Sequence, residues 1–96
     1  MVYHISYHFY SDNAPDESFF EMLDDISGGC IQLGFDGSLL IDVALEAKGL
    51  EDYLSPFFPH ELDRYIILPF VRKKSRCKVS KKEQEFIKNH WDNVPK

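Results

Sequence analysis

The sequence is short of the residues that build several common kinds of site. Its only cysteines, Cys30 and Cys77, lie far apart and outside any Cys-x-x-Cys spacing, which predicts free thiols in a cytoplasmic protein. The longest apolar run spans residues 65–71, far below the ~20 residues of a membrane-spanning helix. The first residues also lack the basic segment and apolar stretch of a signal peptide. We therefore expect no membrane association.

Phosphate-binding loops and metal-binding clusters are missing as well. The glycines at 28–29 and 34–37 lack the spacing of a dinucleotide-binding or nucleoside-triphosphate-binding loop and are typical of turns. His4 and His8 lie on one predicted strand, where four residues correspond to ~13 Å, too far for both to bind one metal ion. We expect neither a metal nor a cofactor.

A thiol-based or carboxylate-based active site is not favoured either. Cys77 lies among basic residues that would lower its pKa if it were exposed, but the sequence positions no histidine or oxyanion site beside it. We expect an inert, half-buried cysteine. Paired carboxylates such as Asp24-Asp25 fall on a predicted solvent-facing helix surface, where nothing indicates a raised pKa. Binding is therefore favoured over catalysis.

What the sequence does contain is a steep separation of charge. Residues 1–71 hold thirteen acidic and two basic side chains, whereas residues 72–96 hold three acidic and nine basic ones. The two parts carry formal net charges of −11 and +6, which gives −5 for the chain. Such a separation concerns partners and association rates rather than the fold.

Hydrophobic periodicity divides the first half of the chain into three strands and one helix. Residues 3–9 alternate as a strand, residues 16–26 have the period of an amphipathic helix, and residues 30–35 alternate again. Asp36-Gly37 is a hairpin signal. The return strand is predicted over residues 39–47, with a helix as the competing interpretation. The predicted core positions are Tyr3, Ile5, Tyr7 and Phe9; Phe19, Phe20, Met22, Leu23 and Ile26; Ile31, Leu33 and Phe35; and Leu39, Ile41, Val43, Leu45 and Ala47.

The second half predicts a short helix, a strand and a final helix. Residues 50–54 favour the short helix, which a proline-flanked stretch interrupts. A buried strand follows over residues 65–71, with Pro69 placing it at a sheet edge or near its own end. Ser80 and Glu83 form a capping box that begins a helix with an apolar side at Phe86, Ile87, His90, Trp91 and Val94.

These elements predict a single α+β domain over residues 1–96. Their order, β-α-β-β-α-β followed by a helix, matches a ferredoxin-like split βαβ arrangement with one helix appended. The expected architecture is a four-stranded, mostly antiparallel sheet with helices on one face and a C-terminal helix.

The acidic side of the first helix is the leading candidate site. Small acidic proteins capture basic clefts on their partners by electrostatic steering, as immunity proteins and antitoxins do with toxins. The sequence therefore favours a cytoplasmic inhibitor of this class that covers a basic site on another protein. Exposed aromatic residues near the acidic helix would act as anchors. The candidate partner-binding residues are Glu17, Glu21, Asp24, Asp25, Tyr53, Phe57 and Phe58.

The basic stretch between residues 72 and 82, which holds seven of the chain's eleven bases, favours an alternative. In an extended chain its alternate residues would point to one side, about 7 Å apart, close to the spacing of phosphates in a nucleic-acid strand. A small nucleic-acid-associated regulatory protein is the rival hypothesis, although the acidic body of the chain would repel a duplex. Its candidate residues are Arg72, Lys74, Arg76 and Lys78.

Overall fold

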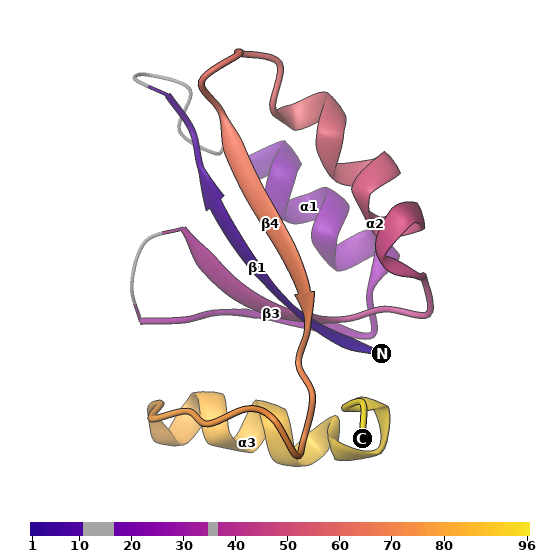
Figure 1. Ribbon diagram of the computed structural model, residues 1–96, viewed down its shortest axis with the longest axis vertical. Helices are drawn as coiled ribbons and strands as arrows, with labels where there is room; N and C mark the ends of the chain where they lie inside the picture. Colours follow the sequence, from indigo (N-terminus) through magenta and orange to yellow (C-terminus); the bar gives the residue numbers. More distant parts are fainter. Residues whose placement is uncertain (11–16, 35–36) are drawn as a thin grey trace.

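A computed structural model describes residues 1–10, 17–34 and 37–96. Four strands form one antiparallel sheet in the order β2-β3-β1-β4, and the α+β class is as predicted (Figure 1). The strands are β1 (Val2–His8), β2 (Gly29–Gln32), β3 (Ser38–Asp42) and β4 (Arg64–Pro69). The helices are α1 (Glu17–Ile26), α2 (Ala47–Leu54) and α3 (Lys81–Asn89), with short 3₁₀ turns η1 (Ser55–Phe57) and η2 (Trp91–Asn93).

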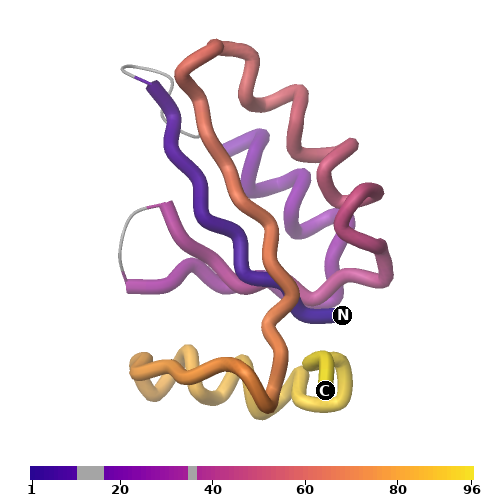
Figure 2. Tube along the Cα trace, in the orientation of Figure 1, coloured from indigo at the N-terminus to yellow at the C-terminus, as the bar shows by residue number. Residues whose placement is uncertain are grey.

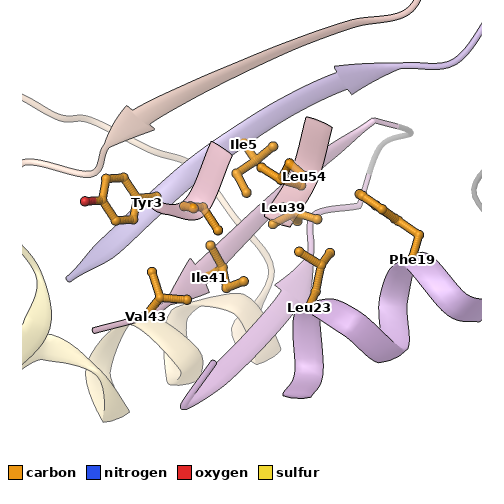
Figure 3. Close-up of a cluster of buried hydrophobic side chains, with 9 residues drawn as sticks. Tyr3, Ile5, Phe19, Leu23, Leu39, Ile41, Val43 and Leu54 are labelled. Atoms are coloured by element: carbon orange, nitrogen blue, oxygen red, sulfur yellow. The ribbon is translucent and has the colours of Figure 1, made fainter. Parts of the chain in front are cut away.

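The main core lies between one face of the sheet and helices α1 and α2. Odd-numbered residues of β1 point into it because side chains alternate along a strand, and Tyr3 and Ile5 are fully buried there. Ile41 and Leu39 stand opposite them on β3, and Phe19 and Leu23 of α1 and Leu50 and Leu54 of α2 close the cluster (Figure 3). The predicted core sides of β1 and α1 are confirmed.

The opposite face of the sheet is covered by α3 at one end. Val2 and Leu40 point to this side and are buried with Val94 in a second cluster, to which Phe86 and Ile87 of α3 contribute. Helices α1 and α2 lie on one face, as predicted, but α3 lies on the other, so the helices do not share a face. The cause is that a few positions on this second face, Val2, Ile31 and Leu40, also carry apolar side chains, and these form the cluster on which α3 packs.

The third strand is shorter than predicted. It ends at Asp42, which pairs with Val2 at the very start of β1. Val43 still bonds to Met1 through both of its backbone groups, and the chain then leaves the sheet. The chain turns at residues 43–46, and Ala47, predicted to end the strand, begins α2 instead. Part of the hairpin signal falls outside the described residues, but Gly37 has the positive φ of 75° that tight turns require.

The fourth strand lies at the sheet edge, as Pro69 predicts, but it is not buried on both sides. Ile67 is half-buried against the main core and Tyr65 is half-buried against the Phe58 ring. On the other side, Ile66 and Leu68 are 58% and 54% exposed. The exposure of one face could not be predicted, because both faces of this strand carry hydrophobic side chains and its sequence does not alternate between apolar and polar residues.

The C-terminal helix begins at the predicted capping box. The Ser80 hydroxyl accepts a hydrogen bond from the Glu83 amide at 3.3 Å, and the Glu83 carboxylate accepts one from the Ser80 amide at 3.3 Å. Phe86, Ile87 and Val94 pack on the second cluster as expected, but Trp91 is 45% exposed. Figure 2 shows that the chain between β4 and α3 doubles back alongside the helix.

Candidate functional site

The acidic side chains of α1 all point to solvent. They are Glu17, Glu21, Asp24 and Asp25, and the opposite side of the helix is fixed in the core by Phe19 and Leu23. The ion pairs of the described residues join Asp42 to the Met1 amino group and His90, and Lys48 to Glu51 and Asp52. Within that described part, no basic residue from 72–82 forms an ion pair with α1, although Lys82 lines one surface hollow together with Asp24.

The three aromatic candidates are not equivalent. Tyr53 on α2 is 47% exposed. Phe57 and Phe58 are half-buried and belong to an aromatic cluster: Phe58 stacks on Phe9 with ring centroids 4.4 Å apart, and Phe57 meets Phe19 edge-on at 5.5 Å. Of the three, only Tyr53 is available as an exposed anchor.

The basic segment is not a strand. Residues 72–74 form a turn, and residues 75–80 have no regular structure before α3 begins. Arg72 is tied to the C-terminal region: its guanidinium lies 4.5 Å above the Trp91 ring and donates to the Trp91 carbonyl, and its amide donates to the Pro95 carbonyl at 2.7 Å. The expected ladder of four equally spaced bases is therefore not formed.

The other three bases of that set surround one cavity instead. Lys74, Arg76 and Lys78 line a hollow of about 480 Å³ between this segment and the second face of the sheet. Its inner wall is apolar and includes Leu40 of β3 and Leu68 of β4. Sequence reasoning missed this site, because the strand that holds Leu68 was expected to be buried and Leu40 was not among the predicted core positions.

His4 also lines the cavity and is bonded to a buried serine. Its Nε2 lies 2.7 Å from the hydroxyl oxygen of Ser38, and burial lowers the pKa of the imidazole, which therefore stays neutral near pH 7. A serine beside a histidine is the core of an acyl-transfer site. Here Ser38 is only 3% exposed, and no carboxylate of the described residues orients His4, so the pair is structural.

Asp42 forms a second polar cluster where α3 meets the sheet. Its carboxylate, 5% exposed, accepts from Asn93 Nδ2 at 2.8 Å and lies 2.7 Å from His90 Nδ1. The His90 ring stacks on Phe86, with centroids 4.3 Å apart. This cluster joins two layers of the fold and has no opening to a cavity among those described, which favours a structural role.

The two cysteines are free thiols, as predicted, and differ in environment. Burial, and to a lesser extent the nearby charge of Asp24, raises the pKa of Cys30 to about 12. Cys77 is exposed rather than half-buried as expected, and it lies on the rim of the cavity.

Within residues 1–10, 17–34 and 37–96, no three His, Cys, Asp or Glu side chains gather closely enough to hold a metal ion. None of the described helices is both long and apolar enough to span a bilayer. Comparisons with protein-family models, curated protein sequences and solved structures found no significant match.

Proposed function

We propose that this chain is a small binding module that inhibits a partner protein by covering a basic site with the acidic face of α1, in the manner of an immunity protein or antitoxin. The observation that supports it is the unpaired state of that face: four exposed carboxylates on one helix side, with no ion pair to a base within the described part of the chain. Carboxylates already paired with basic residues of the same chain would attract a basic partner only weakly.

The position of the opposite charge supports the same function. Helix α1 packs on one face of the sheet, and most of the basic segment lies with α3 at the other face, with Lys82 alone lining a hollow that Asp24 also lines, among the described residues. Acidic and basic side chains are therefore concentrated on different parts of the surface. The electric field of a charged partner orients such a molecule as it approaches, which raises the association rate at low ionic strength. Tyr53, exposed on the neighbouring helix, supplies an aromatic anchor.

The test is retention of a partner by the immobilised protein from an extract of its own cells. Wild-type protein should retain one basic protein in a 1:1 complex that weakens as salt is raised. The variant Glu17→Gln, Glu21→Gln, Asp24→Asn, Asp25→Asn should bind it at least tenfold more weakly, because about 1.4 kcal/mol of lost charge contacts has this effect. The retained protein should also lose its activity in the complex.

A matched control separates the α1 face from total charge. The variant Asp52→Asn, Glu61→Gln, Glu85→Gln, Asp92→Asn removes four exposed carboxylates elsewhere and should bind like wild type. Equal binding by the α1 variant and this control would reject the acidic-face assignment, as would the recovery of no basic partner at low salt.

The rival function, nucleic-acid association through residues 72–82, has one observation in its favour. Lys74, Arg76 and Lys78 converge on a single cavity. Against it, Tyr3 and Tyr7 of β1 and the following Phe9 pack on the main core, so the central strands offer no stacking platform on the other face. A gel shift with single-stranded RNA at low salt, abolished when the three bases become glutamine, would establish it.

Two finer assignments belong with this proposal. The strand order β2-β3-β1-β4 with helices after β1 and β3 supports a ferredoxin-like split βαβ arrangement for residues 1–69, with α3 appended. The two free thiols support a reducing, cytoplasmic location.

A further inference from the structure

The cavity under residues 74–79 has the size of a small-molecule site. Its volume of about 480 Å³ falls within the range of roughly 300–1,000 Å³ that holds small ligands. Residues of β1, β3, β4 and α3 contribute to its wall, together with Leu33, Phe70 and the connecting segment 74–79.

The charge around this cavity has one sign. Three cationic side chains line it, and none of the described residues of its wall carries a carboxylate, in a chain whose acids outnumber its bases by sixteen to eleven. Lys74 and Lys78 have no ion pair or side-chain hydrogen bond within the described residues. The Arg76 guanidinium donates to the neighbouring Ser75 carbonyl, at 3.1 Å, and to no other group of the residues that the structure describes. An anion at the rim would relieve the repulsion among these three charges.

The floor of the cavity has the opposite character. Leu40, Leu68, Phe70 and Ile87 line it, and Leu68 is 54% exposed although it is strongly apolar. A fully hydrated anion such as inorganic phosphate would leave this surface wet. A ligand with an apolar group beside its charge would cover it and gain the free energy of removing apolar area from water.

We propose that this cavity binds a small organic anion with an apolar body, namely a phosphate monoester or carboxylate attached to an aryl or short alkyl group. Lys74, Arg76 and Lys78 hold the anionic group at the rim, and the apolar group rests on the floor. The neutral imidazole of His4 adds a polar contact without further charge. This site lies on the other face of the sheet from the α1 surface and is independent of the proposed protein-binding function.

Calorimetric titration with three probes tests the proposal. Phenyl phosphate carries both chemical features, inorganic phosphate carries only the charge, and phenol carries only the ring. Phenyl phosphate should bind at least about tenfold more tightly than either of the others, because both parts of the site contribute to its affinity.

Two variants and a matched control locate the site. Lys74→Gln with Lys78→Gln should weaken phenyl phosphate binding about five- to tenfold, and Leu68→Ser, at an exposed position of the edge strand, should weaken it without unfolding the protein. Lys81→Gln with Lys88→Gln removes the same charge from exposed positions of α3 that do not line the cavity and should leave affinity unchanged. Circular dichroism confirms that each variant is folded.

Three outcomes would overturn the proposal. These are the absence of phenyl phosphate binding by the wild type, an equal loss in the control and the cavity variants, and tighter binding of a short single-stranded oligonucleotide that competes at the same residues. The last result would assign the cavity to the nucleic-acid function instead. The α1 variant should bind phenyl phosphate normally, so failure here is separable from failure of the protein-binding proposal.

Discussion

Asp42 is the residue on which the attachment of the C-terminal helix depends most directly. It lies at the end of β3, and its partners His90 and Asn93 follow α3. Nothing local in the sequence predicts this contact, because the partners are 48 and 51 residues away. Sequence reasoning placed His90 correctly on the inner side of the helix but gave it no polar partner.

Replacing Asp42 with alanine should lower the free energy of unfolding by about 2–4 kcal/mol, because buried donors lose a charged acceptor. Urea denaturation measures this loss. The control is Asp92→Ala, an exposed position where the change should stay within about 0.5 kcal/mol. Similar losses in both variants would show that Asp42 does not hold α3.

The same carboxyl should make stability depend on pH in the acid range. Burial raises the pKa of Asp42, but hydrogen bonds from Asn93, His90 and the Met1 amino group outweigh it and hold the pKa below its ordinary value of 3.8. The contribution of a carboxyl with a lowered pKa is complete above its unfolded pKa and is lost as the pH falls through the folded pKa. The free energy of unfolding should therefore decline below about pH 4, and Asp42→Asn should show a shallower decline. Parallel pH profiles would contradict this.

The two thiols should react at very different rates. Cys77 is exposed, whereas Cys30 is half-buried with a pKa raised to about 12, and the thiolate is the reactive form. Ellman's reagent should modify one thiol in the native protein and two after unfolding. Cys77→Ser should remove the native reaction, and Cys30→Ser should leave it unchanged. Rapid modification of the Cys77→Ser variant would mean that Cys30 is accessible.

At the scale of elements, local pattern predicted most of what the structure contains. The alternation of β1, the amphipathic period of α1 and the capping box of α3 are properties of neighbouring residues. The end of β3 and the one-sided burial of β4 cannot be predicted from neighbouring residues. They depend on which strands and helices pack beside each strand in the folded sheet. That strand order is set by contacts distant in sequence.

The N-terminal caps of α2 and α3 differ, and mutation can test the consequence for stability. Ser80 caps α3 with its hydroxyl, whereas Glu46 at the start of α2 makes no side-chain capping bond although its backbone is extended as a cap requires. Ser80→Ala should cost about 1 kcal/mol, and Glu46→Ser should add about 0.5–1 kcal/mol. Thermal unfolding monitored by circular dichroism measures both. Shifts of the same sign would show that capping does not control these two helices.

At the scale of the whole molecule, the separation of charge was readable from the sequence and the cavity was not. Counting acids and bases requires no structure. The cavity combines side chains of three strands, a helix and a connecting segment, and only the folded arrangement brings these together. Sequence reasoning therefore predicted helix α3 but did not predict which face of the sheet it covers.

The contact between α3 and the sheet is tight at Gly29. A Cβ at this position would lie 2.8 Å from the His90 ring, which Asp42 and Phe86 hold in place. Gly29→Ala should therefore destabilise the protein by about 1–3 kcal/mol, as overpacking does. The control is Gly34→Ala, where a Cβ meets open space. Urea denaturation that ranks the two variants equally would exclude tight packing of the two layers at this point.

The strand order also dictates how the chain reaches its folded state. The β2–β3 hairpin joins neighbouring segments, but β1 pairs with β3 and β4, which both follow it at long range. During synthesis β1 leaves the ribosome before either neighbour exists, with its aromatic side uncovered. Completion of the sheet waits until β4 has emerged, and such non-local topologies fold slowly. The nascent chain therefore passes through an interval in which its central strand is open to association with other chains.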